Sequence, residues 1–234
     1  MPEPAGPLGI LMLDTRFPRI VGDIGNPASF DFPVIYRRLE GIGPADAVTA
    51  TPDRTRIEAA LAANARSLVD AGAVGISTSC GFLALFQREL SALSAVPVAT
   101  SALLLLAEAR GRRAGVLTAS AANLTPRHFQ AVGADPGTPV EGLPPDGAFA
   151  GTFLRNGTTL DRKAVEAETV AAGRALLARC PDLDLLVLEC TNLPPYKAAL
   201  RAALGIEVRD VLDLLAGFHA AIIARRSPSG SAAS

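Results

Sequence analysis

Two stretches of the chain decide its fold: residues 73–81 read AVGISTSCG, and residues 184–192 read DLLVLECTN. Each begins with a short apolar run typical of a buried strand, and each precedes a pattern typical of a helix. Cys80 and Cys190 are therefore predicted at strand-to-helix turns, one in each half of the chain. Because the positive end of a helix dipole lowers the pKa of a thiol, we expect two reactive thiols that exchange protons with one ligand from opposite sides.

Strand and helix patterns alternate along the whole chain. We predict strands over residues 8–13, 45–48, 74–77, 96–99, 115–118, 185–189 and 206–208, and helices over residues 53–71, 159–179 and 211–224. Thr51 and Pro52 supply a cap and a first-turn proline for the first of these helices, and Gly72 ends it. Short apolar strands alternating with helices indicate an α/β protein with parallel sheets and helices on both sides.

The two cysteine stretches echo each other, which suggests two similar lobes with a cleft between them. We expect a first α/β lobe over residues 1–100 plus 208–226, a second over residues 101–207, and a disordered Ser- and Gly-rich tail over residues 227–234. Ligands of open parallel sheets bind at the carboxyl ends of strands, where both cysteines fall. The long connections over residues 16–33 and 135–151 are also expected to have functional roles.

Composition narrows the class of protein. The chain has 234 residues, 49% of them hydrophobic, and a formal net charge of −1, which argues against a nucleic-acid or anionic-membrane partner. The apolar run over residues 101–107 is too short to span a bilayer, and no positive segment precedes Leu8 as in a secretory signal. We therefore expect a cytoplasmic protein without disulfides, in which the third cysteine, Cys180, only packs.

At these cysteines the chain resembles the aspartate/glutamate/hydantoin racemase superfamily, which includes maleate isomerase and arylmalonate decarboxylase. Residues 186–194, LVLECTNLP, resemble the family's strand followed by Cys-Thr-His and a proline. The first motif matches in two registers, with either Ser77 or Cys80 at the family's cysteine position. The Asn26-Pro27 pair and the segment over residues 115–118 also fit.

The resemblance implies two pseudo-symmetric α/β lobes, each a parallel sheet flanked by helices, with the active site in the cleft between them. It also implies chemistry with neither pyridoxal phosphate nor a metal, and such lobed enzymes are often homodimers. The two histidines form no metal-binding motif in the sequence, and no pyridoxal lysine motif is present. Asn192 stands where racemases of the glutamate type have a histidine, which favours another acid or a hydantoin-like ring as the substrate.

The expected site combines two thiols with groups that stabilise negative charge on a substrate carboxylate. The predicted catalytic residues are Cys80 and Cys190. Asp14 and Asp23 are candidates to orient a thiol or bind a substrate amino group. Strand alternation predicts that Glu189 points away from Cys190, with either a structural role or a role in supporting the residues that contact the substrate. The predicted substrate-binding residues carry hydroxyls or amides: Asn26, Ser77, Thr78, Ser79, Thr118, Thr191 and Asn192.

These expectations lead to one leading hypothesis and two alternatives. The leading hypothesis is a cofactor-independent racemase or epimerase of the amino-acid racemase type, acting at the α-carbon of a small carboxylate through two thiol bases. The first alternative is a single-cysteine decarboxylase or cis–trans isomerase of the same superfamily, in which Cys190 acts alone. The second is a catalytically silent protein that binds small molecules.

Overall fold

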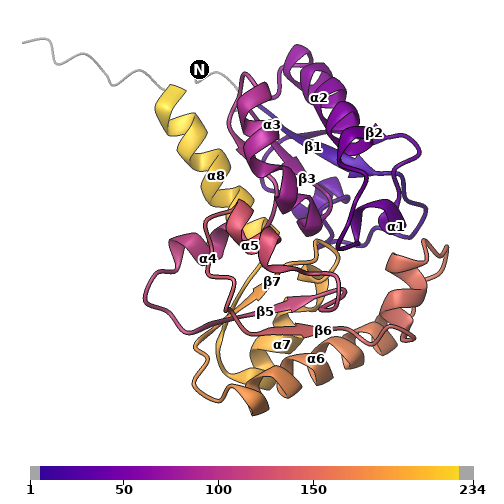
Figure 1. Ribbon diagram of the computed structural model, residues 1–234, viewed down its shortest axis with the longest axis vertical. Helices are drawn as coiled ribbons and strands as arrows, with labels where there is room; N and C mark the ends of the chain where they lie inside the picture. Colours follow the sequence, from indigo (N-terminus) through magenta and orange to yellow (C-terminus); the bar gives the residue numbers. More distant parts are fainter. Residues whose placement is uncertain (1–5, 227–234) are drawn as a thin grey trace, which may run out of the picture.

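A computed structural model describes residues 6–226 and contains two parallel four-stranded sheets (Figure 1). The first sheet has the order β2-β1-β3-β4, and its strands are β1 Leu8–Leu13, β2 Val34–Leu39, β3 Gly75–Thr78 and β4 Val98–Ala99. The second has the order β6-β5-β7-β8, and its strands are β5 Ala114–Thr118, β6 Val140–Gly142, β7 Leu185–Leu188 and β8 Glu207–Arg209. The two sheets repeat one strand order, so the predicted two-lobe α/β fold is confirmed.

Helices connect the strands and cover both sheets. They are α1 Pro44–Ala47, α2 Arg54–Asp70, α3 Gln87–Leu93, α4 Leu104–Glu108, α5 Pro126–Ala131, α6 Arg162–Arg179, α7 Lys197–Leu204 and α8 Val211–Arg226. Short 3-10 helices span Pro27–Ser29, Gly81–Phe86 and Pro194–Tyr196, and a π-helical turn spans Ala150–Leu154. None of the helices within residues 6–226 is both long and apolar enough to cross a membrane.

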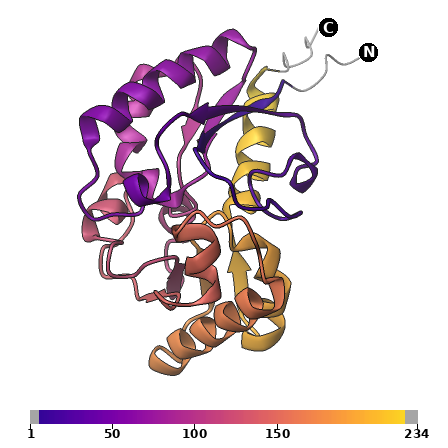
Figure 2. The ribbon, with the colours of Figure 1, turned by 90° about the vertical axis from the view of Figure 1, so that its right-hand side faces the viewer.

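The first sheet is sandwiched between α2 and α8 (Figure 2). A Cβ atom at Gly9 of β1 would lie 2.9 Å from Leu68 of α2, so this strand packs directly on the helix. A Cβ atom at Gly75 of β3 would lie 2.6 Å from Ile222 of α8. Gly9 pairs with Ile76, the neighbour of Gly75, so the two glycines face opposite sides of the sheet. The C-terminal helix therefore returns to cover the first lobe.

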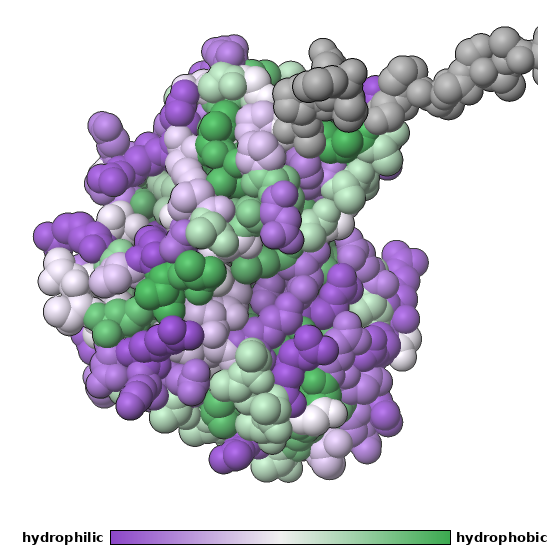
Figure 3. Space-filling view, turned by 180° about the vertical axis from the view of Figure 1, so that it is seen from behind, coloured by the Kyte–Doolittle hydropathy of each residue, from purple (hydrophilic) through white to green (hydrophobic). Residues whose placement is uncertain are grey.

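Apolar side chains form two core clusters. The larger includes the first sheet, α2 and α8, and continues to Val116 and Val187 on one face of the second sheet. The smaller lies on the other face of the second sheet, under α6 and α7. On the face drawn in Figure 3, hydrophilic and hydrophobic residues are interspersed. The shared cluster packs the lobes against each other, which places the carboxyl ends of both sheets close together.

Several sequence predictions need correction. Residues 45–48 do not form a strand, because Pro44–Ala47 is the short helix α1. Two strands were missed, β2 and β6; both lie at sheet edges, and none of their residues except Leu39 is buried, so they lack the apolar runs of central strands. The cap of α2 is Asp53, whose side chain accepts the N–H of Arg56 at 3.1 Å.

The strand predicted over residues 8–13 coincides with β1, and, apart from residues 45–48, the other predicted strands are present with shifts of one or two residues at their ends. Of the predicted helices, the second begins at Arg162 rather than at residue 159. The predicted lobe boundaries stay a prediction. The predicted disordered tail and the first five residues lie outside the described part of the chain.

Candidate active site

The loops after β3 and β7 place the two cysteines at the carboxyl edges of their own sheets. β3 ends at Thr78, and the side chain of Ser79 accepts the N–H of Leu13 at 2.9 Å, which ties the loop to the end of β1. Cys80 then caps the 3-10 helix Gly81–Phe86. β7 ends at Leu188, and Cys190 follows Glu189 ahead of the 3-10 helix Pro194–Tyr196. Each cysteine therefore lies two residues after the end of the third strand of its sheet.

The two cysteine loops contact each other directly, although they are more than one hundred residues apart in the chain. The hydroxyl of Thr191 donates to the backbone oxygen of Ser79 at 2.6 Å, and both groups are buried. The N–H of Ile24, in the loop after β1, donates to the backbone oxygen of Thr191 at 3.5 Å. The junction of the lobes is therefore held by hydrogen bonds from the residues beside the cysteines.

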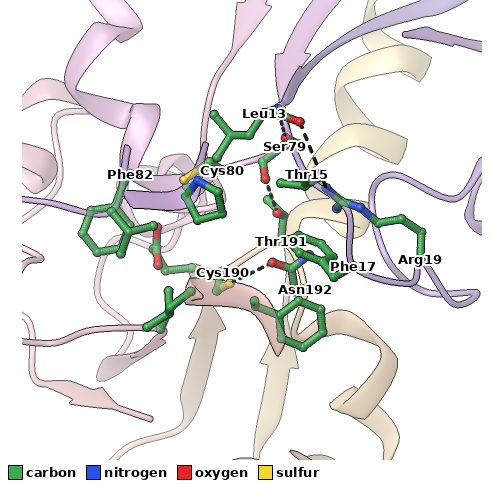
Figure 4. Close-up of a pocket in the computed structure, with 17 residues that line it drawn as sticks. Leu13, Thr15, Phe17, Arg19, Ser79, Cys80, Phe82, Cys190, Thr191 and Asn192 are labelled. Carbon is green, nitrogen blue, oxygen red and sulfur yellow. Dashed lines mark hydrogen bonds between the residues drawn. The ribbon is translucent and has the colours of Figure 1, made fainter. Parts of the chain in front are cut away.

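Cys80 and Cys190 line one pocket at this junction (Figure 4). The space between its walls, open mouth included, is about 390 Å³, and about 30 Å³ of it can hold the centre of a water molecule. Its walls combine the two thiols with polar side chains and with aromatic rings, and these residues include Thr15, Phe17, Arg19, Ser79, Phe82, Phe153, Glu189, Thr191 and Asn192.

A chain of polar contacts connects Arg19 to Cys190. Arg19 pairs with Asp23 at 2.8 Å, and the other oxygen of Asp23 accepts the amide N–H of Asn192 at 2.7 Å. The thiol of Cys190 donates to the amide oxygen of Asn192, with sulfur and oxygen 3.7 Å apart. Because Asp23 is 1% exposed and accepts from both partners, it fixes Arg19 and Asn192 relative to the thiol. Asn192 thus orients the thiol of Cys190 by accepting a hydrogen bond from it, but an amide does not take up the proton.

Arg19 places a positive charge on the pocket wall, and sequence reasoning missed it. A second guanidinium nitrogen donates to the hydroxyl of Thr15 at 2.8 Å, and the guanidinium carbon lies 4.2 Å from the ring centroid of Phe17. These contacts hold a planar cation where a substrate carboxylate can pair with it. In the sequence Arg19 is one arginine in a loop without periodicity, so only the fold reveals its position.

Glu189 also lines the pocket, contrary to the prediction that it points away. The strand ends one residue earlier, so strand alternation does not extend to this side chain. Glu189 is 0% exposed, and one carboxylate oxygen accepts the hydroxyl of Thr118 at 2.6 Å. The other oxygen has no hydrogen-bond partner among residues 6–226. Burial raises the pKa of Glu189 to about 7, against the lowering effect of Thr118.

The expectation of lowered thiol pKa values is wrong. Burial, and after it the charge of Glu189, raises the pKa of Cys80 to about 12, although the backbone N–H groups of Phe82 and Leu83 favour the thiolate. The same two causes raise the pKa of Cys190 well above its ordinary value. Two short 3-10 turns supply too few N–H groups to offset desolvation beside a carboxylate. At rest both cysteines are therefore protonated thiols.

The structure brings some of the predicted site residues together and keeps others apart. Five of them line the pocket: Ser79, Cys80, Cys190, Thr191 and Asn192. Of the two registers of the first motif, Cys80 is the one in the pocket, whereas Ser77 is buried within β3. Asp23 and Thr118 do not line the pocket themselves. Each is hydrogen-bonded to a residue that does, Asp23 to Asn192 and Thr118 to Glu189.

Three further predicted residues bond elsewhere. Thr78 donates its hydroxyl to the backbone oxygen of Thr100 at 2.7 Å. Asn26 caps the 3-10 helix Pro27–Ser29 and donates to the backbone oxygen of Arg19. Asp14 accepts the N–H of Gly41 at 3.0 Å and is partly exposed. Within the described residues no cluster of three histidine, cysteine or carboxylate side chains could hold a metal ion.

No protein-family model matches the chain. Among curated proteins, it is 26% identical to a dimethylsulfoniopropionate lyase from Durusdinium sp. clade D, over 88% of this chain and 71% of that one. It is 30% identical to dimethylsulfoniopropionate lyase 5 from Emiliania huxleyi (strain CCMP1516), over 92% of this chain. The chain spans less than half, 45%, of that second relative.

Solved structures with similar folds include arylmalonate decarboxylase and glutamate racemases. Unliganded arylmalonate decarboxylase aligns with a TM-score of 0.57 and 19% identity, over 96% of this chain and 94% of that one. A glutamate racemase from Francisella tularensis, solved with D-glutamate, aligns with a TM-score of 0.59 and 18% identity, over 97% of this chain and 84% of that one. The expected resemblance is confirmed at the level of the fold: this chain has the two-lobe fold of the aspartate/glutamate racemase superfamily.

Proposed function

We propose that this protein is an enzyme that removes the proton α to the carboxylate of a small substrate, with Cys80 or Cys190 as the base. One observation carries the proposal: two thiols from two separate sheets line a single pocket that also holds a fixed arginine. Loss of an α-proton leaves negative charge on the substrate carboxylate. Arg19 would pair with that charge, and the thiol beside the α-carbon would take the proton.

The fate of the carbanion decides the reaction class, and the curated relatives favour elimination. Dimethylsulfoniopropionate carries a sulfonium cation two carbons from its carboxylate carbon. When a base takes the α-proton, the C–H electrons form the carbon–carbon double bond, the C–S bond breaks, and dimethyl sulfide leaves with that bonding pair. The proton stays on the base, and acrylate remains. We propose this lyase reaction, on that compound or another β-sulfonium carboxylate, as the leading function.

The pocket walls offer what a sulfonium cation needs. Such a cation donates no strong hydrogen bond, so ring faces and carboxylates are the groups that can stabilise it. Phe17, Phe82 and Phe153 line the pocket, and the rings of Phe17 and Phe153 meet edge to face with centroids 4.9 Å apart.

Racemisation or epimerisation is the second candidate, favoured by the presence of a thiol on each lobe. One base suffices for elimination, whereas inversion at the α-carbon needs a proton donor on the face opposite the base. A two-base racemase would therefore lose inversion if either cysteine were replaced. Elimination would depend on the one cysteine that faces the α-proton.

One incubation separates these functions. The protein is mixed in deuterated water with dimethylsulfoniopropionate, and separately with amino acids and hydantoins, while headspace chromatography follows dimethyl sulfide and NMR follows α-deuterium. Dimethyl sulfide release that is lost in Cys80→Ser or Cys190→Ser, and kept in Cys180→Ser, supports the lyase. Deuterium incorporation with inversion and no sulfide supports the racemase. Neither signal from folded protein would contradict both and favour a binding protein.

A further inference from the structure

We propose that Glu189 is the proton acceptor that converts Cys80 into a thiolate: the buried carboxylate takes the S–H proton of Cys80 as the substrate binds. The S–H bond breaks, an O–H bond forms on Glu189, and the negative charge moves from the carboxylate to the sulfur. Glu189 thus acts through Cys80 rather than on the substrate. This inference rests on the proposed α-proton abstraction, for which Cys80 is then the base.

The first argument is the unpartnered oxygen of Glu189. Its carboxyl is completely buried, and Thr118 satisfies only one of its two oxygens. Within the described residues the second oxygen accepts no hydrogen bond, and leaving a buried carboxylate oxygen unsatisfied costs free energy. A glutamate with only a structural role would be expected to have both oxygens paired. Glu189 retains an acceptor on the wall of the pocket.

The second argument is where that oxygen lies. A Cβ atom at Gly81 would clash with this oxygen and with the backbone oxygen of Glu189. Only glycine leaves room there, so the free oxygen contacts the residue that directly follows Cys80. The lack of a side chain at position 81 therefore brings a carboxylate from the second lobe against the cysteine loop of the first.

The third argument is the state of the two thiols. The S–H of Cys190 is already donated to Asn192. The described residues offer the S–H of Cys80 no acceptor at hydrogen-bond distance, and its sulfur accepts the backbone N–H groups of Phe82 and Leu83, which stabilise a thiolate. No hydrogen bond joins Cys80 to Glu189 in this structure. A rotation of the Cys80 side chain or one bridging water completes the path, as in other sites whose contacts tighten on substrate binding.

The surrounding charges favour a transfer that keeps the net charge of the site constant. The charge of Glu189 is itself a cause of the high thiol pKa, so protonating Glu189 removes that penalty as the thiolate forms. Arg19 favours the thiolate of Cys80. Asp23 is neutralised by Arg19, and His128, edge-on to Phe82, is neutral because burial lowers its pKa to about 4. One negative charge is thus shared by the carboxyl and the thiol.

The test measures alkylation of Cys80 by iodoacetamide without substrate, using peptide mass spectrometry to separate it from Cys180 and Cys190. Below about pH 7 the wild-type rate rises roughly tenfold per pH unit; above it, where Glu189 is ionised, the rate levels off because each new thiolate must protonate Glu189. In Glu189→Gln the rate continues to rise roughly tenfold per unit through pH 9. Equal pH profiles for the two proteins would overturn the inference, whatever the substrate.

Turnover supplies the second readout. In wild type kcat/KM falls as pH drops through about 7, because the carboxylate is the acceptor. Glu189→Gln loses this pH dependence and about 10²-fold or more in rate, Glu189→Asp keeps the dependence with part of the rate, and the exposed Glu207→Gln matches wild type. A levelled alkylation profile with no turnover on any substrate would leave this inference standing and count against the proposed function alone. Near-full turnover in Glu189→Gln would overturn the inference.

Discussion

In the first lobe, Ser79 follows β3 and donates its N–H to the backbone oxygen of Leu11 at 2.9 Å; in the second, Glu189 follows β7 and donates its N–H to the backbone oxygen of Leu117 at the same distance. Ser79 and Glu189 therefore occupy equivalent positions, and so do Cys80 and Cys190. The backbone plan is repeated, while the residue before the cysteine changes from a small hydroxyl to a carboxylate.

This difference makes the two thiols unequal. The hydroxyl of Ser79 is used within its own lobe, where it accepts the N–H of Leu13. Glu189 reaches across the junction to Gly81, beside the cysteine of the other lobe. Cys190 donates its S–H to the side chain of Asn192 and accepts one backbone N–H, whereas Cys80 accepts two backbone N–H groups and donates to no described residue. A repeated fold can thus place two identical side chains in one pocket and still assign them different roles.

Replacing the cysteines is the strongest way to break the comparison. Cys80→Ser is expected to lower turnover about 10²-fold or more, because a hydroxyl is a far weaker acid than a thiol. If the reaction is elimination with Cys80 as the base, Cys190→Ser keeps more of the rate. If it is racemisation, both variants lose inversion, and each keeps solvent exchange with one enantiomer only. The rates of sulfide release and of α-deuterium incorporation distinguish these outcomes.

The pH dependence of stability tests the burial of Glu189, whose equivalent in the first lobe is Ser79. Because burial raises the pKa of Glu189 from 4.5 to about 7, the folded state binds the proton more tightly, and its stability falls as pH rises through that window. The expected loss in the free energy of unfolding is about 3 kcal/mol. Urea unfolding at pH 4.5 and 8 measures it, and Glu189→Gln should lack this part of the slope. An identical slope in the variant would contradict the burial of an ionisable Glu189.

Asp23→Asn tests the series of polar contacts from Arg19 through Asp23 and Asn192 to Cys190. Among the described residues, Cys80 has no equivalent series of contacts. The variant weakens the pairing of Arg19 and offers an amide to Asn192, so we expect a loss of roughly 1–3 kcal/mol in the free energy of unfolding, with a fall in kcat/KM. Asp14→Asn, at a partly exposed position of the same lobe, should change stability by less than about 0.5 kcal/mol. Unchanged kcat/KM in Asp23→Asn would show that this series of contacts does not serve the reaction.

The last comparison concerns stability alone, at the repeated glycines of the central strands. Gly9 packs on Leu68, and at the equivalent position of β5 a Cβ atom at Gly115 would lie 2.8 Å from Leu183 and 3.0 Å from Leu176 of α6. Gly9→Ala and Gly115→Ala should each cost roughly 1–3 kcal/mol, since each overpacks a helix–sheet contact.

The matched control for these glycines is Gly217→Ala in α8, where nothing lies within 4 Å of the added Cβ atom. It should stabilise the protein by about 0.5–1 kcal/mol, since alanine is the better helix former. Thermal unfolding of the three variants measures the comparison. If only one of Gly9→Ala and Gly115→Ala lowers the stability, the two lobes share the backbone arrangement but not the tight packing of a helix on the central strand.

The sequence by itself determined that the chain has two similar sheets whose central strands lead to the two cysteines. The apolar runs of β1, β3, β5 and β7 are central and buried, so periodicity and composition locate them. Cys80 and Cys190 follow because they come directly after two of those runs. The edge strands β2 and β6 are mostly only part-buried, and their residues carry too little apolar pattern to be found this way.

Only the tertiary structure decided the chemistry of the pocket. The direction of Glu189, the position of Arg19 and the raised pKa of both thiols depend on which groups the two lobes bring together. Thr191 and Ser79 meet across 112 residues of chain, and no local pattern records that contact. Local sequence determines strands and turns through short-range sterics and burial. Desolvation and charge pairing depend instead on every atom packed around a group, and that environment exists only once both lobes have folded together.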